Sequence, residues 1–134
     1  MTIVANTYDM RTLPSAGKDW HVSLQTADAR GCEAIKAAET GFSHYITKLV
    51  VHSDVSMDVS VGSGGDDGTE VTTVHFGPIP LKKSGPAQGL TVIPFIWNAP
   101  RGKGIKCTSG LSIAIDSTII GALSIEANGK TCKD

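Results

Sequence analysis

The stretch GFSHYITKLVVHSDVSMDVSVGSGGDDGTEVTTV, residues 41–74, decides the fold. Within it, residues 55–61 alternate strictly between apolar and polar side chains, with valine or methionine on one parity and serine or aspartate on the other. Such alternation predicts a β-strand that buries one face and exposes the other. Residues 44–53 are apolar on both parities, which is typical of a strand in the centre of a sheet and covered on both faces.

The residues after this strand predict a hairpin. Residues 62–68, GSGGDDG, are rich in the residue types that tolerate positive φ angles in tight turns. Residues 69–77 then resume an extended pattern rich in threonine and valine. We therefore predict a β-hairpin with its tip at residues 62–68.

Extended segments also flank this hairpin. Residues 20–26 place Trp20, Val22 and Leu24 on one side of a two-residue repeat, which predicts a half-buried strand. Residues 32–40 suit either a short helix or an edge strand, and we favour a strand. Further segments rich in Ile, Leu, Val or Thr are separated by turn-forming residues: 78–81, 90–97, 104–108, 110–116 and 118–127. The prolines of the first of these cannot donate to a ladder, which favours a sheet edge or a link between sheets.

These patterns predict an all-β protein. They indicate an antiparallel β-sandwich of about eight strands in a jelly-roll-like arrangement. Residues 1–19 keep no period and contain Pro14 and Gly17, so we predict an irregular N-terminal arm there. A chain of 134 residues fits one domain, and we place the β-sandwich domain at residues 20–134.

The composition argues against several classes of partner. Charged residues make up 19% of the chain and the formal net charge is -1, so no strong field attracts nucleic acid or anionic lipid. No apolar run approaches the length of about eighteen residues that a membrane span needs, and the first residues lack a signal-peptide pattern. We therefore expect synthesis in a cytoplasm without membrane insertion. Three cysteines lack any C-x-x-C spacing and are expected to be reduced, partly buried thiols: Cys32, Cys107 and Cys132.

No metal site is predicted from the four histidines, His21, His44, His52 and His75. His44 and His52 share one strand but lie roughly 26 Å apart at the strand rise, which is too far to share an ion. Pairing of His52 with His75 across two strands stays open. Scattered surface or interface histidines are the favoured interpretation.

Two further motifs could bind ions or phosphate, but each has a simpler interpretation. Asp66, Asp67 and Glu70 offer carboxylates to calcium, but the EF-hand spacing is absent and turn chemistry explains the same residues. Residues 128–131, NGKT, resemble the end of a phosphate-binding loop, but Ser124 stands where that loop requires glycine. We therefore predict no cofactor.

No catalytic residue is predicted either. Ser63 lies in the predicted hairpin tip, without the strand-to-helix turn that activates a serine nucleophile. Cys107 and Cys132 lack a local sign of the electropositive surroundings that activate a thiol. Trp97 could stack on a sugar, but its place at the end of an apolar strand favours packing. Five basic residues form two short clusters in predicted loops, where solvent or a protein partner would meet them: Lys82, Lys83, Arg101, Lys103 and Lys106.

Two longer segments resemble a known family. Residues 41–54, GFSHYITKLVVHSD, and residues 90–126, LTVIPFIWNAPRGKGIKCTSGLSIAIDSTIIGALSIE, follow a layout that resembles the capsid decoration, or cement, proteins of tailed bacteriophages. The resemblance covers about two thirds of the chain, residues 41–127. It departs at the end, LSIEANGKTCKD, where many relatives close on a small-residue-then-aromatic strand, and in the longer arm before Trp20. The matching positions are Tyr45, Ile46, Thr47, Pro94, Phe95, Pro100 and Gly104.

The resemblance implies a β-sandwich with a structural role. It implies a non-enzymatic virion component on the outside of the capsid, made in the host cytoplasm. The implied partners are the major capsid protein and two further copies of the chain in a homotrimer. The implied action is to bind where major-capsid subunits meet and to stabilise the shell.

The N-terminal arm is the predicted partner-binding segment. An irregular arm can lie along a partner and gain order there, which adds contact area. We name Tyr8, Met10, Arg11 and Leu13 as its partner-binding residues. In a homotrimer, three arms would bind at high effective concentration, so that weak single contacts add up to tight binding.

Two other functions stay open at this point. A head-fibre or tail module would bind host glycan through Trp97 or through the hairpin tip at residues 62–68. A cupin-like metalloenzyme would need a tight cluster of histidines and a carboxylate, and the sequence lacks the expected spacing.

Overall fold

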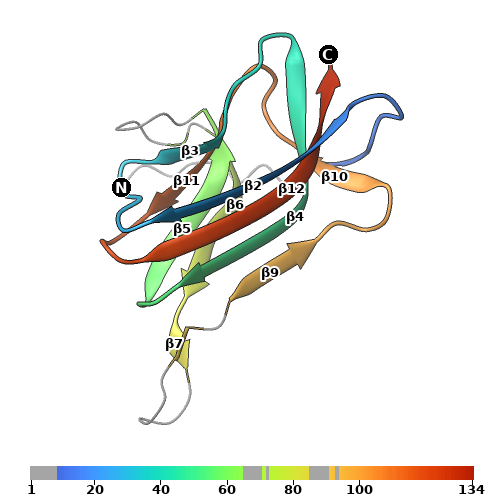
Figure 1. Cartoon of the computed structure of the whole chain (residues 1–134). Coiled ribbons are helices and arrows are strands. Elements are labelled where there is room, and N and C mark those ends of the chain that lie inside the picture. Colours follow the sequence, from blue (N-terminus) through green and yellow to red (C-terminus); the bar gives the residue numbers. More distant parts are fainter. Residues whose placement is uncertain (1–8, 65–70, 72, 85–90, 93) are drawn as a thin grey trace.

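The computed structural model describes residues 9–64, 71, 73–84, 91–92 and 94–134 of the chain (Figure 1). Within these residues the regular structure consists of β-strands, and no helix there is long and apolar enough to cross a membrane. The strands in chain order are β1 (Met10–Thr12), β2 (Lys18–Thr26), β3 (Glu33–Lys36), β4 (Phe42–Ser53), β5 (Met57–Ser63), β6 (Thr73–Leu81), β7 (Lys83–Ser84), β8 (Thr91–Val92), β9 (Phe95–Asn98), β10 (Lys103–Lys106), β11 (Ile113–Ser117) and β12 (Leu123–Lys133).

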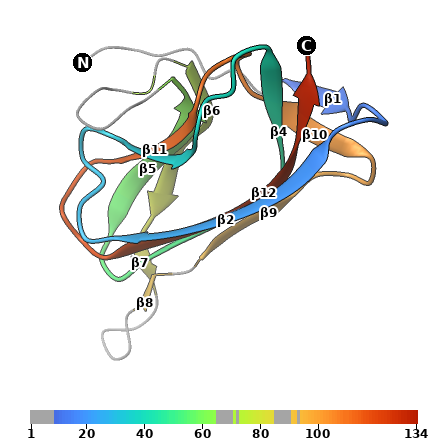
Figure 2. The ribbon, with the colours of Figure 1, turned by 45° about the horizontal axis from the view of Figure 1, so that its top comes forward.

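Two antiparallel sheets pack face to face (Figures 1 and 2). The large sheet has the order β1-β10-β4-β12-β2, and β9 pairs with β4 on the same side as β10. The small sheet has the order β3-β11-β5-β6, while β7 and β8 pair with each other. The prediction of an all-β antiparallel sandwich is confirmed.

The strand pairing is nested, as in a long hairpin that has been folded over. β5 pairs with β6, β4 with β9 and β10, β3 with β11, and β2 with β12. β9 meets residues 48–51 of β4 and β10 meets Tyr45 and Ile46, so β9 and β10 together act as one interrupted strand. If β1 is left aside, each of the two sheets has four strands, which is a jelly-roll-like arrangement. One sheet then consists of β2, β12, β4 and β9/β10, and the other of β3, β11, β5 and β6.

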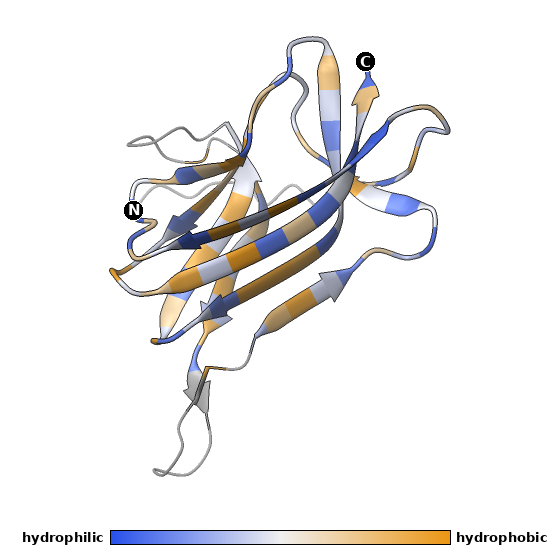
Figure 3. Cartoon of the chain, viewed as in Figure 1, coloured by the Kyte–Doolittle hydropathy of each residue, from blue (hydrophilic) through white to orange (hydrophobic). Residues whose placement is uncertain are grey.

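The core lies between the sheets and takes alternate residues from each strand. On β5, Met57, Val59 and Val61 are buried, whereas Asp58 and Ser60 are half-buried. Burying one such apolar side chain contributes about 1.5–3 kcal/mol relative to leaving it exposed. Figure 3 shows the same alternation as hydrophobic and hydrophilic bands along β12. The predicted strand at residues 20–26 is confirmed. The one predicted at residues 55–61 is confirmed from Met57 onward, because Val55 and Ser56 precede β5.

β4 lies inside the large sheet, as predicted, but only its first part is covered on both faces. The residues from Ser43 to Ile46 are buried, whereas Lys48 is exposed. The outer cover near Tyr45 comes from β10 and from the residues after β1. Gly104 of β10 fits between Leu13 and Tyr45, where a Cβ atom would meet Leu13 Cδ2 at 3.0 Å and Tyr45 Cβ at 3.4 Å.

The N-terminal segment is more regular than its sequence predicts. Met10–Thr12 form β1, which pairs with β10 at the edge of the large sheet, and β2 begins at Lys18 rather than Trp20. Residues 13–17 are not in a strand, and Lys130 Nζ donates to the carbonyl oxygen of Pro14 at 2.9 Å. The edge of β10 offers backbone groups to a passing chain, and this pairing is not visible as a period in the sequence.

Three other segments differ from the predicted strands. Residues 118–122 form a turn, so the last strand begins at Leu123 rather than residue 118. That strand then continues to Lys133, through residues 128–131. The segment 90–97 is split into β8 and β9, and β5 extends to Ser63, inside the predicted hairpin tip. Residues 65–68 of that tip lie outside the described residues.

Two further strand predictions agree with the structure. β3 lies within the segment 32–40, for which a strand was favoured over a helix. Residues 78–81 belong to β6, which is an edge strand of the small sheet, as the prolines predict.

Candidate functional site

Three turns meet at one end of the sandwich: residues 27–32, 54–56 and 118–122. Backbone hydrogen bonds tie them to one another. Gly121 N donates to Ala27 O at 3.0 Å, and Asp54 N donates to Ala122 O at 3.1 Å. This end of the molecule is therefore a connected surface rather than three independent loops, and we call it the turn end.

The turn end displays two large apolar side chains. Ile119 is 42% exposed and Ile120 is 59% exposed. Their turn is held by the Ser117 hydroxyl, which donates to Ile119 O at 3.1 Å, and by Thr118 N, which donates to Asp58 O at 3.0 Å. Because the backbone is already ordered, docking a partner on these isoleucines costs little conformational entropy. We call residues 118–122 the isoleucine turn.

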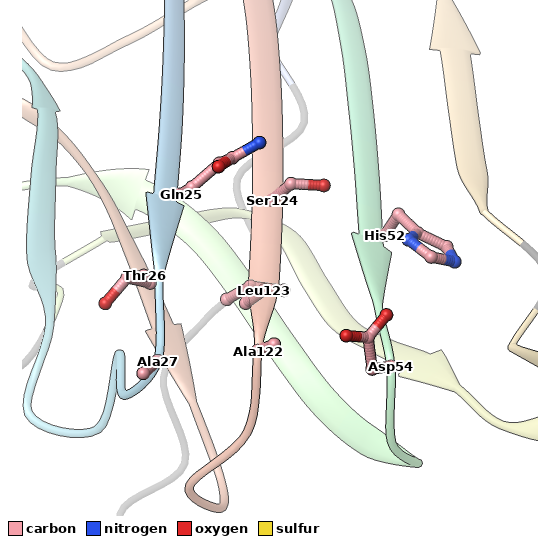
Figure 4. Close-up of a pocket in the computed structure, with 8 residues that line it drawn as sticks. All are labelled: Gln25, Thr26, Ala27, His52, Asp54, Ala122, Leu123 and Ser124. Atoms are coloured by element: carbon pink, nitrogen blue, oxygen red, sulfur yellow. The ribbon is translucent and has the colours of Figure 1, made fainter.

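A hollow of about 440 Å³ lies beside the isoleucine turn on the outer face of the large sheet (Figure 4). Ser124 of β12 stands opposite both Gln25 of β2 and His52 of β4. The short serine between two longer side chains leaves a depression, which Ala122 and Asp54 continue toward the turn end. The lining residues are Gln25, Thr26, Ala27, His52, Asp54, Ala122, Leu123 and Ser124.

The charge in the hollow is negative. Asp54 is exposed and has no ion pair within the described part of the chain. The neighbouring carboxylates differ, because Arg30 Nε lies 3.0 Å from Asp28 and Lys82 Nζ lies 3.3 Å from Asp58. The hydrogen bonds from Arg30 hold the pKa of Asp28 below its usual value. Among the residues that the structure describes, no lysine or arginine lines the hollow, so its carboxylate is left to solvent or to a partner.

The predicted arm residues lie at the opposite end and contact the chain itself. Met10 packs against the core, and Leu13 N donates to Gly102 O at 2.9 Å. Arg11 is exposed, and its Nε donates to Asp9 Oδ1 at 2.9 Å. Tyr8 lies outside the described residues. A partner-binding role for these four residues stays a prediction, and of the three described only Arg11 has an exposed side chain.

A second groove, of about 370 Å³, lies next to this arm. It contains Phe42, which is partly exposed, and Cys132, which is buried. The groove is lined by Pro14, Ala16, Gly17, Lys18, Phe42, Thr131, Cys132 and Lys133. Lys130 holds the arm over the adjacent strand end through its bonds to Pro14 and Ser15, so the groove is a product of the arm's own packing.

The structure separates the histidines. His52 lies on β4 in the hollow and His75 lies on β6 of the small sheet, so the cross-strand pairing of the two that the sequence left open is wrong. His21 Nδ1 lies 2.8 Å from Asn128 Oδ1 on the outer face. Within the described residues, no three His, Cys, Asp or Glu side chains come together in a way that could hold a metal ion. Asp66, Asp67 and Glu70, the calcium candidates, lie outside the described residues.

The sequence did not predict that Ser63 and His75 meet. Ser63 Oγ lies 2.7 Å from His75 Nε2, and Thr108 N donates to Ser63 Oγ at 3.0 Å. Serine and histidine at this distance are also found in nucleophilic sites. Here Ser63 is 0% exposed and His75 is 2% exposed, so a substrate cannot reach the pair. These two hydrogen bonds connect Ser63 of β5 with His75 of β6 and with Thr108, and we assign them a structural role.

All three cysteines are buried, as expected of structural thiols. Burial raises the pKa of Cys107 to about 12, so its thiol stays protonated at neutral pH. Burial also raises the pKa of Cys132, with a smaller opposing effect from Lys130. These surroundings disfavour the nucleophilic thiolate at both positions.

The remaining candidates take structural places. Trp97 is half-buried and packs edge-on against Phe76, with ring centroids 5.0 Å apart, so the packing interpretation is confirmed. Residues 128–131 belong to β12, without a helix N-terminus for phosphate. Among the basic residues, Lys82 and Arg101 lie between strands as predicted, whereas three lie in strands: Lys83, Lys103 and Lys106.

The hollow and the isoleucine turn could be predicted only in part from the sequence. Alternation places Gln25 on the outer face of its strand, but the neighbours of that strand cannot be read from the sequence. The isoleucine turn carries an apolar composition that favours a strand, and no local signal distinguishes it from one.

Comparison with known proteins gives a weak structural likeness. No protein-family model matches the sequence, and no curated protein matches it significantly. Among solved structures, a chain of the cyanophage Pam1 capsid asymmetric unit aligns over 97% of this chain and 93% of its own length, with a TM-score of 0.38 and 11% sequence identity. A likeness of this size assigns neither a family nor a function.

Proposed function

We propose that this chain is a structural virion protein, a decoration or cement protein that binds the outside of a phage head between major-capsid subunits. It acts as a non-enzymatic homotrimer, without cofactor, and stabilises the shell after synthesis in the host cytoplasm. Its partners are the major capsid protein and its own copies, and neither nucleic acid nor a membrane takes part.

The observation that carries this proposal is the isoleucine turn. Ile119 and Ile120 are two adjacent, exposed apolar side chains on a turn that hydrogen bonds hold in place. Exposed apolar groups that lie together and are rimmed by polar residues mark protein-binding surfaces. A preordered apolar anchor of this kind is typical of the small set of residues that dominate the binding energy of an interface.

The low charge of the chain supports the same proposal. Charged residues make up 19% of the sequence, and polar uncharged groups such as Gln25 and Ser124 occupy the outer face beside the isoleucine turn. Burying such groups against a protein costs less desolvation free energy than burying lysine or glutamate. Interfaces are depleted in charged residues at their centres for the same reason.

Several residues that carry the sequence resemblance occupy structural positions in the fold. Tyr45 and Ile46 are buried at the start of β4, where β10 pairs with them. Gly104 allows β10 to approach, because a Cβ atom there would lie 3.2 Å from the carbonyl oxygen of Ile46. Three of the resembling positions, Tyr45, Ile46 and Gly104, thus lie at the junction of β4 and β10, whereas Phe95 lies on β9.

The test compares binding to undecorated heads. The probe is undecorated heads assembled from the major capsid protein of the phage whose genome encodes this chain. Wild-type protein should sediment with these heads, raise their rupture temperature and elute as a trimer. Ile119→Ser/Ile120→Ser should weaken binding at least tenfold, about 1.4 kcal/mol, because the apolar anchor is lost.

The matched control is Ile96→Ser, which changes an exposed isoleucine on β9, away from the isoleucine turn. It should bind as wild type does, and both variants should unfold at the wild-type temperature. Heads that bind no wild-type protein and rupture at an unchanged temperature would contradict the proposed function. Glycan-array binding without head binding would favour the receptor-binding alternative instead.

A further inference from the structure

We infer that the hollow beside the isoleucine turn holds a basic side chain, arginine or lysine, of the protein that the turn docks against. This inference rests on the proposed function and deepens it, because it names the surface and the chemistry of the contact. The partner would present an apolar socket for Ile119 and Ile120 with a cationic side chain next to it.

The shape of the hollow suits a long, narrow side chain. Gln25, Ser124 and His52 lie in one row across β2, β12 and β4, and the short serine occupies the middle position. In Figure 4 the Gln25 side chain extends toward Ser124, while the His52 ring is turned away from Ser124; all three residues and Asp54 line the hollow. Its lining offers oxygen acceptors from an amide, a hydroxyl and a carboxylate, which suits the several N–H donors of arginine or lysine.

The charge of the hollow selects a cation. Asp54 has no ion pair within the described residues, while Asp28 and Asp58, at the same end, are paired with Arg30 and Lys82. The uncompensated charge next to the isoleucine turn is therefore negative. A partner surface that is complementary in potential would place a positive group opposite it.

The position of Asp54 relative to the isoleucines is fixed. Asp54 N donates to the carbonyl oxygen of Ala122, the last residue of the isoleucine turn, at 3.1 Å. Gly121 N, in the same turn, donates to Ala27 O at 3.0 Å. The carboxylate and the apolar pair therefore belong to one preordered surface. A partner that presents an apolar socket and a basic side chain at matching positions can bind both features together. Little conformational entropy is then lost on binding.

Two other occupants fit less well. In a two-fold contact with a second copy, the same negatively charged patch would be present on both surfaces and no cation would be supplied to Asp54, which charge complementarity disfavours. A sugar would gain from the broad face of a tryptophan, tyrosine or phenylalanine, and the described lining residues include none of these three. These considerations favour a different protein with a basic residue.

The experiment measures binding to the same undecorated heads by sedimentation, at about 50 mM and about 300 mM NaCl. Asp54→Arg should weaken binding at least tenfold, since it places a positive charge opposite the basic side chain of the partner. Asp54→Asn should weaken binding less and should reduce its salt dependence. The control is Asp19→Arg, which makes the same charge change at an exposed position on β2 at the opposite end, and it should bind within about twofold of wild type.

The outcomes separate this inference from the proposed function. If wild-type protein binds heads and Asp54→Arg binds equally well, the inference is overturned while the proposed function stands. If wild-type protein does not bind, the proposed function is overturned and this inference with it. Thermal unfolding of each variant shows whether the fold is kept, and Asp54→Ser replaces Asp54→Arg if the arginine variant does not fold.

Discussion

His44 is held in its neutral form by the residues around it. It is buried on β4, its Nε2 lies 2.8 Å from the carbonyl oxygen of Ala37, and its Nδ1 lies 2.7 Å from Thr131 Oγ1. A neutral ring that donates from Nε2 and accepts at Nδ1 satisfies both partners. Burial lowers the pKa of His44, and Lys36 lowers it further, while the Ala37 carbonyl and Glu39 oppose the shift.

This histidine predicts acid sensitivity. Because its folded-state pKa lies below the ordinary value of 6.5, the unfolded chain binds a proton that the folded chain rejects. The free energy of unfolding should therefore be highest above about pH 6.5 and should fall as the pH drops toward the folded-state pKa of His44. Urea unfolding between about pH 7.5 and about pH 5 measures this decrease.

The comparison of variants isolates the contribution of His44. His44→Gln can still donate to the Ala37 carbonyl, and it should remove part of the pH dependence. His21→Gln, at an exposed position on β2, should keep the wild-type dependence. Equal slopes for wild type and His44→Gln would refute the assignment.

The buried thiols predict slow chemistry in the folded state. Burial raises the pKa of Cys107 to about 12, and Cys32 and Cys132 are buried as well. A thiol-specific disulfide reagent at about pH 8 should therefore leave the folded protein almost unmodified and should titrate all three cysteines once urea unfolds it. Rapid reaction of a thiol in the folded protein would show that one of them is accessible.

At the scale of the strand, β12 depends on a glycine. A register shift occurs between Asn128 and Gly129, and a Cβ atom at Gly129 would collide with the carbonyl oxygen of Tyr45 and the ring of Trp20. Gly129 therefore lets β12 pass between β4 and the Trp20 side chain of β2. No larger residue fits this position without moving one of those neighbours.

Gly129→Ala should lower the free energy of unfolding by about 1–3 kcal/mol, since the added methyl group overpacks the site. Chemical unfolding monitored by tryptophan fluorescence measures the change, and Trp20 is close enough to report it. Ser124→Ala, on the outer face of the same strand, should change the free energy by less than about 0.5 kcal/mol. A Gly129→Ala protein as stable as wild type would mean that the strand can relax there.

Particular strands show what sequence reasoning can reach. Residues 57–61 and 20–26 were predicted correctly as strands, because alternation is set by which face a strand buries, and that is a local property. Residues 118–122 were predicted as strand and form a turn, because apolar composition does not reveal whether a backbone partner is available. Met10–Thr12 became a strand for the converse reason, since β10 supplied an edge from about ninety residues away.

At the scale of the whole molecule, the candidate site depends on the order of the strands. Gln25, His52 and Ser124 come from three separate parts of the sequence, and only the pairing of β2, β12 and β4 brings them into one row. Alternation predicted the outward side of Gln25 but could not supply its neighbours. The meeting of Ser63 with His75 was missed because the register of β5 and β6 shifts twice between Val59 and Gly62.

The two ends of the molecule differ in character. The turn end carries the isoleucine pair and an unpaired carboxylate, while the opposite end carries the arm packed on its own sheet. The arm was the predicted binding segment, and the turn end is the surface that the structure adds. Head-binding assays on variants of the isoleucine turn test the turn end and leave the arm unchanged.

The nested pairing has a consequence for synthesis. β12 lies between β2 and β4, so these two early strands have no native neighbour between them until residues 123–133 have left the ribosome. Until then the nascent chain exposes the edges and apolar faces of both strands. A stalled or shortened translation product would therefore be prone to aggregate rather than to fold in part.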